Sequence, residues 1–113
     1  MFKPSELKEL ELEDLLSSLA QRVEESGNEW ANAKANYEQL SLFEKTVLYR
    51  NMPTEGSVED RKRIAYTSKE YIIHLEGLAS THKDAIAKEA KHKSELCKFE
   101  AIKSIFLKRV ARL

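Results

Sequence analysis

Three side chains capable of metal binding and proton transfer, His82, Glu89 and His92, share one face of a predicted helix in the second half of the chain. Glu89 and His92 stand three residues apart, a spacing that lets one helical turn present a carboxylate and an imidazole to the same point. Di-iron carboxylate sites need two such motifs and further glutamates, and the sequence holds no second Glu-x-x-His. We therefore interpret these residues as polar positions that fix helix register or oligomeric state, with a metal enzyme as the alternative.

The rest of the sequence shows no arrangement typical of an active site. It has no glycine-rich phosphate loop, and no Ser/His/Asp or Cys/His set at a spacing that argues for a nucleophile. Cys97 is the single cysteine, so an internal disulfide is excluded and a reducing, cytoplasmic location is the default expectation. We predict a protein that is not an enzyme and needs no cofactor or metal.

Lysine and arginine residues are the stronger lead to function. Residues 1–57 carry 6 Lys or Arg and 11 Asp or Glu, whereas residues 58–113 carry 13 and 8, so the second half is net basic. Cations on the outer face of a helix can contact a phosphate backbone, without sequence specificity and with strong salt dependence. Solvation of an exposed face, or pairing with the acidic first half, is the competing explanation. The candidate nucleic-acid contacts are Arg61, Lys62, Arg63, Lys88, Lys91, Lys98, Lys108 and Arg112.

The apolar pattern predicts two long helices that position these residues. Apolar residues recur at helical spacing from about residue 5 to about residue 50 and from about residue 57 to about residue 112, around a loop at 51–56 that holds Pro53 and Gly56. Gly27 interrupts the pattern, but the phase resumes after it, so we favour one continuous helix there. A break at Gly77 is a minor alternative, because the apolar column passes through it, and the sequence leaves open whether either glycine bends or breaks its helix. A composition with 34% charged residues, 3 Gly and 2 Pro is typical of helices. We predict one all-α domain, residues 1–113, folded as a long antiparallel two-helix hairpin of the coiled-coil type.

The second predicted helix carries apolar columns at a seven-residue spacing. The main column is Ile64, Tyr71, Leu78, Ala85, His92, Phe99, Phe106 and Leu113. Its expected partner column, four residues on, is Ser68, Leu75, His82, Glu89, Leu96, Lys103 and Val110. We expect both columns to face the first helix, with Trp30 beside His82 and Leu16 beside Leu96.

A third column runs beside the other two. A coiled-coil seam needs only two columns, whereas three make a face wide enough to contact two neighbours. We therefore predict a homo-oligomeric helical bundle. The expected interface residues are Ala65, Ile72, Ala79, Ile86 and Leu107.

Segments of both predicted helices carry a family resemblance. In the second helix they are Tyr71-Ile72-Ile73-His74-Leu75-Glu76-Gly77-Leu78 and Leu96-Cys97-Lys98-Phe99-Glu100-Ala101-Ile102-Lys103-Ser104, and in the first helix they are Glu29-Trp30-Ala31 and Ala35-Asn36-Tyr37-Glu38. They resemble small helical proteins of tailed bacteriophages, and the nearest named family is the UvsY-like recombination mediators. The resemblance implies an oligomeric helical protein that binds single-stranded DNA and helps to load recombinase onto strands covered by single-strand-binding protein.

These observations predict a non-enzymatic phage accessory protein that acts in recombination or replication in the host cytoplasm. Its expected partners are other copies of itself, single-stranded DNA, and a recombinase or single-strand-binding protein. We expect no membrane partner, because no stretch approaches the ~20 apolar residues of a membrane span. The alternative is a coiled-coil adaptor, or an inhibitor of a host enzyme, that binds no nucleic acid.

Overall fold

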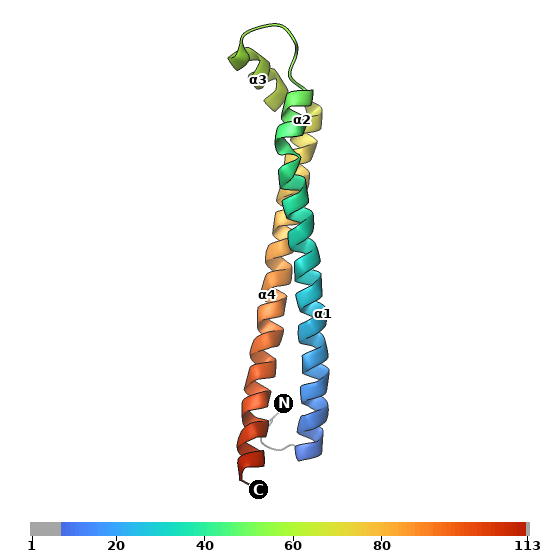
Figure 1. Cartoon of the computed structure of the whole chain (residues 1–113), viewed down its shortest axis with the longest axis vertical. Helices are drawn as coiled ribbons and strands as arrows, with labels where there is room; N and C mark the ends of the chain where they lie inside the picture. Colours follow the sequence, from blue (N-terminus) through green and yellow to red (C-terminus); the bar gives the residue numbers. More distant parts are fainter. Residues whose placement is uncertain (1–7, 113) are drawn as a thin grey trace. The chain divides into compact units, whose positions relative to one another are not determined.

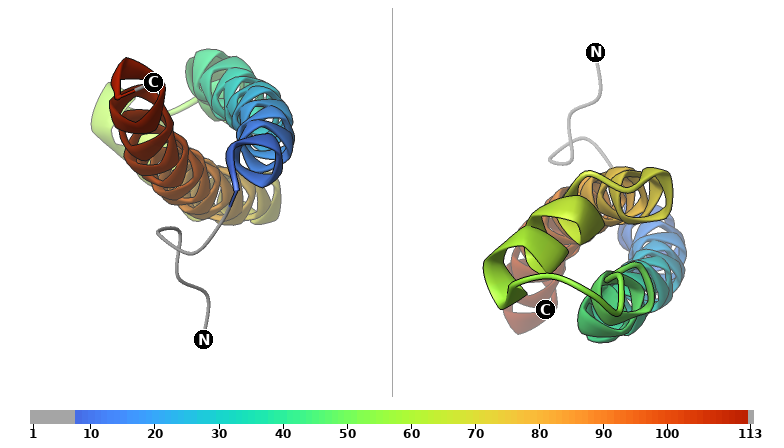
Figure 2. Two further views of the ribbon diagram at one scale, coloured as in Figure 1. Left: turned by 90° about the horizontal axis from the view of Figure 1, so that it is seen from below. Right: turned by 90° about the horizontal axis from the view of Figure 1, so that it is seen from above.

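The computed structural model describes residues 8–112, and within them it contains helices and turns but no strand. The helices of this part of the chain are α1 (Glu9–Leu42), α2 (Glu44–Arg50), α3 (Val58–Tyr66) and α4 (Lys69–Ala111). Within each of the two units described below, α1 and α4 lie side by side and run in opposite directions (Figure 1, Figure 2). The predicted all-α helical hairpin is therefore confirmed.

The first predicted helix is divided near its end rather than at its glycine. α1 continues through Gly27, whereas the chain leaves the α-helix at Phe43, whose N–H is bonded to the Leu40 carbonyl at 3.1 Å. This tighter bond spans three residues instead of four and separates α1 from α2. The predicted start near residue 5 lies outside the described residues.

The second predicted helix, 57–112, is wrong as a single element because it consists of α3 and α4. Thr67 and Ser68 separate them, and both hydroxyls donate to carbonyls of the preceding turn, as in the 2.7 Å bond from Ser68 Oγ to Ala65 O. Ser68 Oγ also accepts from the Tyr71 N–H at 3.3 Å and so caps the start of α4. Hydroxyls that bond to nearby backbone in this way compete with the helix ladder. By contrast, Ser57 caps the start of α3, because its Oγ accepts a 3.2 Å bond from the Asp60 N–H.

The chain packs as two units, and both contain part of α1 and part of α4. Among the described residues, the first unit joins 8–30 with 87–112, and its core contains Leu12, Leu19 and Ile102. The second unit comprises residues 31–86, and its core contains Val47, Leu48, Ala65 and Tyr71. In the second unit α3 packs against α2 (Figure 2).

The main column of α4 faces α1, as predicted. Its described members from position 71 to position 106 are all buried or half-buried. Ile64 is an exception because it belongs to α3, where it is exposed, and Leu113 lies outside the described residues. We call this contact between α1 and α4 within each unit the seam.

The predicted partner column of α4 is wrong. The seam instead uses the column three residues on from the main one, and the predicted column is mostly exposed. A single neighbouring helix covers only two columns of a wide apolar face, so the choice of one side leaves the other side uncovered. The second seam column is His74, Thr81, Lys88, Glu95, Ile102 and Arg109.

The predicted pairing of the two helices is also shifted. Trp30 stacks on His92, with ring centroids 5.6 Å apart, and does not lie beside His82. Tyr37 is the residue beside His82, and the centroids of their rings are 4.7 Å apart. The connection between α2 and α4 contains all of α3. The prediction had assigned these residues to the helix that pairs with the first one, so the predicted pairs are shifted.

The predicted interface column is only partly at the surface. Ala65 is fully buried in the core of the second unit, because α3 ends beside that core, so its assignment to an oligomer interface is wrong. Ile72, Ala79, Ile86 and Leu107 are exposed on α4.

Candidate functional site

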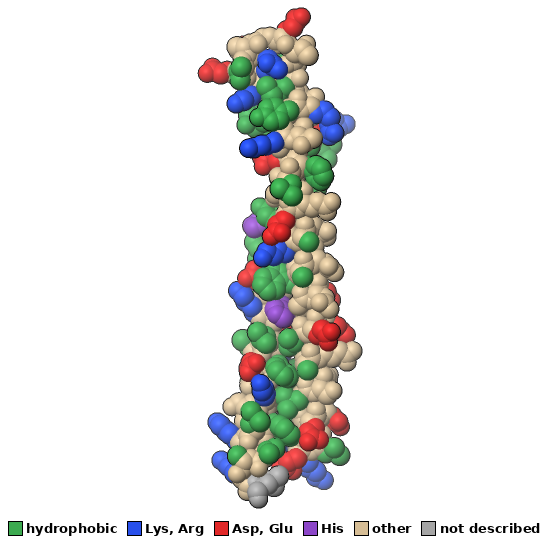
Figure 3. Space-filling model, in the orientation of Figure 1, with side chains coloured by type: hydrophobic (Ala, Val, Ile, Leu, Met, Phe, Trp, Pro, Cys, Tyr) green, Lys and Arg blue, Asp and Glu red, His purple; other side chains and the backbone are tan. Residues whose placement is uncertain are grey.

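Five of the eight predicted nucleic-acid contacts lie on α4 in the first unit. Lys88 is half-buried in the second seam column, so its predicted place on the outer face is wrong. The other four are exposed, and we call them the basic ridge: Lys91, Lys98, Lys108 and Arg112. Lys91, Lys98 and Arg112 recur at multiples of seven residues, so they share one column of the helix. This column borders the second seam column, and its three cations are exposed. In the lower part of Figure 3, Lys and Arg side chains project from the α4 edge, whereas Asp and Glu side chains gather on the α1 edge.

Two cations of the basic ridge are held by carboxylates. Lys91 Nζ lies 3.2 Å from Glu29 Oε2 of α1, and Lys98 Nζ lies 3.9 Å from Glu95 Oε1 one turn earlier. Both partners of the Lys91–Glu29 pair are exposed, and exposed ion pairs contribute about 0–1 kcal/mol. An incoming phosphate can therefore exchange with Glu29 at little cost, whereas Glu95 beside Lys98 is largely buried.

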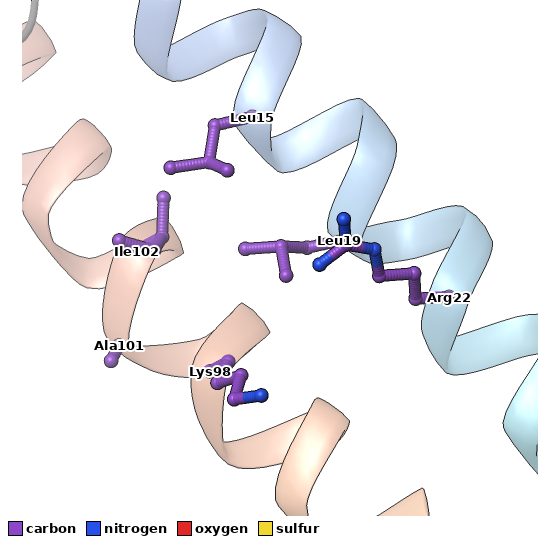
Figure 4. A pocket seen from close by; sticks show the side chains of 6 residues that line it. All are labelled: Leu15, Leu19, Arg22, Lys98, Ala101 and Ile102. Carbon is purple, nitrogen blue, oxygen red and sulfur yellow. The ribbon is translucent and has the colours of Figure 1, made fainter. Parts of the chain in front are cut away.

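An apolar groove lies beside the basic ridge in the first unit. It has a volume of about 460 Å³, and Leu15, Leu19 and Ile102 form its lining, with Ala101 at one margin (Figure 4). Lys98 of α4 and Arg22 of α1 reach it from opposite helices, so cations flank an apolar surface (Figure 4).

Arg22 is a residue that the sequence analysis missed. It also lines a neighbouring polar groove of about 250 Å³ together with Lys91. Its position three residues after the seam residue Leu19 places it beside the seam, which is the signal that could have identified it.

Glu95 gives the polar groove a buried negative charge. Its side chain is 14% exposed, and its Oε2 atom is buried without a hydrogen-bond partner. Glu25 and Glu29 line the same groove, so it holds charges of both signs. Ser26, whose Oγ lies 3.1 Å from His92 Nδ1, also lines this groove.

The remaining three predicted contacts lie on α3 in the second unit. Arg61 Nε donates to the Pro53 carbonyl at 2.6 Å, which fixes the connection before α3. Arg63 pairs with Asp60 at 3.2 Å on the same helix. Lys62 lines a groove with Glu44 and Tyr71 among its neighbours. Arg61 therefore has a structural contact that the sequence did not indicate.

The three polar residues with metal-binding chemistry are engaged separately. His92 Nδ1 lies 3.1 Å from Ser26 Oγ in the seam, and Glu89 Oε1 pairs with Lys93 Nζ at 2.7 Å. His82 is exposed against the Tyr37 ring. Within residues 8–112, no group of three His, Cys, Asp or Glu side chains is placed to hold a metal ion.

The described helices also bear on the membrane expectation. None of those within residues 8–112 is long and apolar enough to cross a membrane.

Comparison with known proteins adds no neighbour to this description. No family model, no curated protein and no solved structure matches the chain.

Proposed function

We propose that the protein is a non-enzymatic accessory protein that binds single-stranded nucleic acid along the basic ridge. The observation that carries this proposal is the apolar groove flanked by Lys98 and Arg22. Bases can lie against its apolar lining while phosphates contact the flanking cations, which is the combination that single-strand binding uses.

The spacing of the ridge cations allows contacts with separate phosphates along one strand. Lys91 and Lys98 are one heptad apart, which is about 10 Å along a helix. The binding would be independent of sequence and sensitive to salt, because it rests on phosphate contacts. The resemblance of residues 71–78 and 96–104 to phage recombination mediators supports the wider proposal that the protein acts with a recombinase or a single-strand-binding protein.

Fluorescence anisotropy with labelled single-stranded DNA at ~50 and ~200 mM salt tests the proposal. We expect tight binding at the lower salt concentration and much weaker binding at the higher one. The variant carrying Lys91→Gln, Lys98→Gln and Arg112→Gln should bind at least about tenfold more weakly, with a salt slope reduced by about 2, because each single-strand phosphate contact contributes about 0.7.

A matched control removes three cations from the second unit: Lys34→Gln, Lys45→Gln and Lys69→Gln. It has the same net charge as the ridge variant, and we expect it to bind as the unmodified protein does. Absence of binding at the lower salt concentration, binding that ignores salt, or equal weakening by both variants would contradict the proposal. Absence of binding by a protein that still self-associates would favour the protein-adaptor alternative.

A further inference from the structure

Six large apolar side chains gather on a face of α4 that α1 leaves uncovered. They are between 39% and 53% exposed, and α4 is one uninterrupted helix from Lys69 to Ala111. They are Ile72, Leu75, Ile86, Leu96, Leu107 and Val110.

These residues form two adjacent columns with reversed spacing. Ile72, Ile86 and Leu107 belong to one column, and Leu75, Leu96 and Val110 belong to the next. In the first column the gaps are two heptads and then three, whereas in the second they are three heptads and then two. Reversing the direction of the helix therefore exchanges the two columns and leaves the pattern unchanged. This is the symmetry that a two-fold axis requires of a self-complementary surface.

We propose that a second copy of this chain packs on this face of α4, with the two α4 helices antiparallel and the two-fold axis level with Lys91. Ile86 then faces Leu96 of the second copy, which places an apolar pair on each side of the axis. Leu75 faces Leu107 of the second copy, and Ile72 faces Val110 of the second copy. All six exposed side chains acquire an apolar partner in this single register.

The charged positions of the same two columns match in the same register. Glu89 faces Lys93 of the second copy, and His82 faces Glu100 of the second copy. Within one chain Lys93 already contacts Glu89 at 2.7 Å, so the axis would be surrounded by a ring of four alternating charges. Complementary charges of this kind select the partner and fix the register.

The last pair of positions also agrees with this packing. Lys103 faces Ala79 of the second copy, where a small side chain leaves room for the aliphatic stem of the lysine. A parallel pairing would instead place Glu89 on Glu89, Lys93 on Lys93 and Lys103 on Lys103, so it is disfavoured by repulsion of like charges.

The face lies in a direction suited to a bundle. Its two columns are about a quarter turn around α4 from the seam, since successive residues of a helix are about 100° apart. A helix of a four-helix bundle contacts neighbours in two such directions. The proposed dimer therefore revises the interface predicted from the sequence by excluding Ala65 and adding the column that contains Leu75, Leu96 and Val110.

A complementary-mixing experiment tests both the partner and the register. Leu75→Lys and Leu107→Glu are prepared as separate variants, and their masses are measured by sedimentation equilibrium at tens of micromolar protein, without nucleic acid. We expect the unmodified chain to be a dimer and each variant alone to be monomeric, with helical circular dichroism retained. An equimolar mixture should regain the dimer mass, because the introduced lysine of one chain faces the introduced glutamate of the other, while the native Leu75 and Leu107 meet at the second site.

Ile73→Lys is the matched control, because Ile73 is an exposed isoleucine of α4 outside the two columns. We expect this variant to remain dimeric. A monomeric unmodified chain, or variants that dissociate but are not restored by mixing, would overturn the proposal. Because no DNA is present, the result is independent of the test of nucleic-acid binding.

Discussion

His92 lies in the seam because Gly27 leaves space for its ring and Ser26 provides a hydrogen-bond partner. Ser26 Oγ lies 3.1 Å from the Val23 carbonyl, to which it donates, and 3.1 Å from His92 Nδ1. A hydroxyl has one hydrogen to donate, so we assign the proton between Ser26 and His92 to Nδ1. A Cβ atom at Gly27 would lie 3.2 Å from His92 Cε1, which explains a glycine in the interior of α1.

Replacing each of the two helical glycines by alanine distinguishes the effect of the close approach to His92 on stability from the effect of helix propensity. Gly77→Ala should stabilise the protein by about 0.5–1 kcal/mol, because nothing lies within 4 Å of the new Cβ and alanine favours the helix. Gly27→Ala should gain less, because the new methyl group displaces His92 from Ser26. Urea unfolding of both variants measures the difference, and equal stabilisation would show that the His92 contact is immaterial.

Tyr71 is the residue whose pKa shift is linked to stability. It is buried in the second unit and donates to Glu44 Oε1 at 2.9 Å. Burial first, and then the hydrogen bond and negative charge of Glu44, raise the pKa of Tyr71 to about 12. The folded state therefore favours the neutral phenol relative to the unfolded chain, where the pKa is about 10.

This linkage predicts a loss of stability at alkaline pH. The contribution of Tyr71 is complete below pH ~10 and declines as the pH rises through the folded-state pKa. Tyr71→Phe keeps the ring packing and should cost about 1 kcal/mol at neutral pH, since one hydrogen bond is lost. The difference in unfolding free energy between the two proteins should shrink as the pH approaches 12, and a difference that stays constant would contradict the assignment.

At the scale of the element, α4 has more apolar surface than one neighbouring helix can cover. Of the three apolar columns identified in the sequence, only the main one belongs to the seam, and the mostly polar second seam column was not predicted. In the structure the column with Ile102 is covered and the column with Leu96 is not. Lys88 and Arg109 of the second seam column are half-buried.

A pair of matched substitutions checks which side of α4 carries the packing. Ile102 is 7% exposed and belongs to the core of the first unit, so Ile102→Ala should cost about 2–4 kcal/mol. Ile73 is 56% exposed, and Ile73→Ala should change stability by less than about 0.5 kcal/mol. Chemical unfolding gives both values, and similar losses for the two variants would argue against this seam.

The break between α3 and α4 shows why the sequence did not predict every helix end. Ile64 and Tyr71 are seven residues apart, so the apolar column continues across Thr67 and Ser68 without a change of phase. The chain ends α3 through hydroxyl-to-carbonyl bonds, which do not alter that spacing. Ser57, by contrast, was predictable because a serine followed by acidic residues is typical of a helix start.

At the scale of the whole molecule, residue spacing within one helix predicted which residues share a surface. It did not predict which residues of the two helices face each other. The basic ridge follows from residue spacing on one helix, whereas the contacts of Lys91 with Glu29 and of Trp30 with His92 depend on the length of the connection. Arg22 was missed for the same reason, because its place beside Lys98 depends on how two distant segments align. Residue patterns therefore locate surfaces on an element better than they locate partners between elements.

The connection between α2 and α4 has a consequence for how the chain can order itself. Arg50 and Glu70 form an ion pair across 20 residues, whereas Ser26 and His92 meet across 66. Loop-closure entropy rises with the length of chain enclosed, so the pairs nearest in sequence close at the lowest entropic cost. Once they have formed, each further pair encloses only a few additional flexible residues. A hairpin of this kind can therefore fold by successive short closures and avoid a single long-range search.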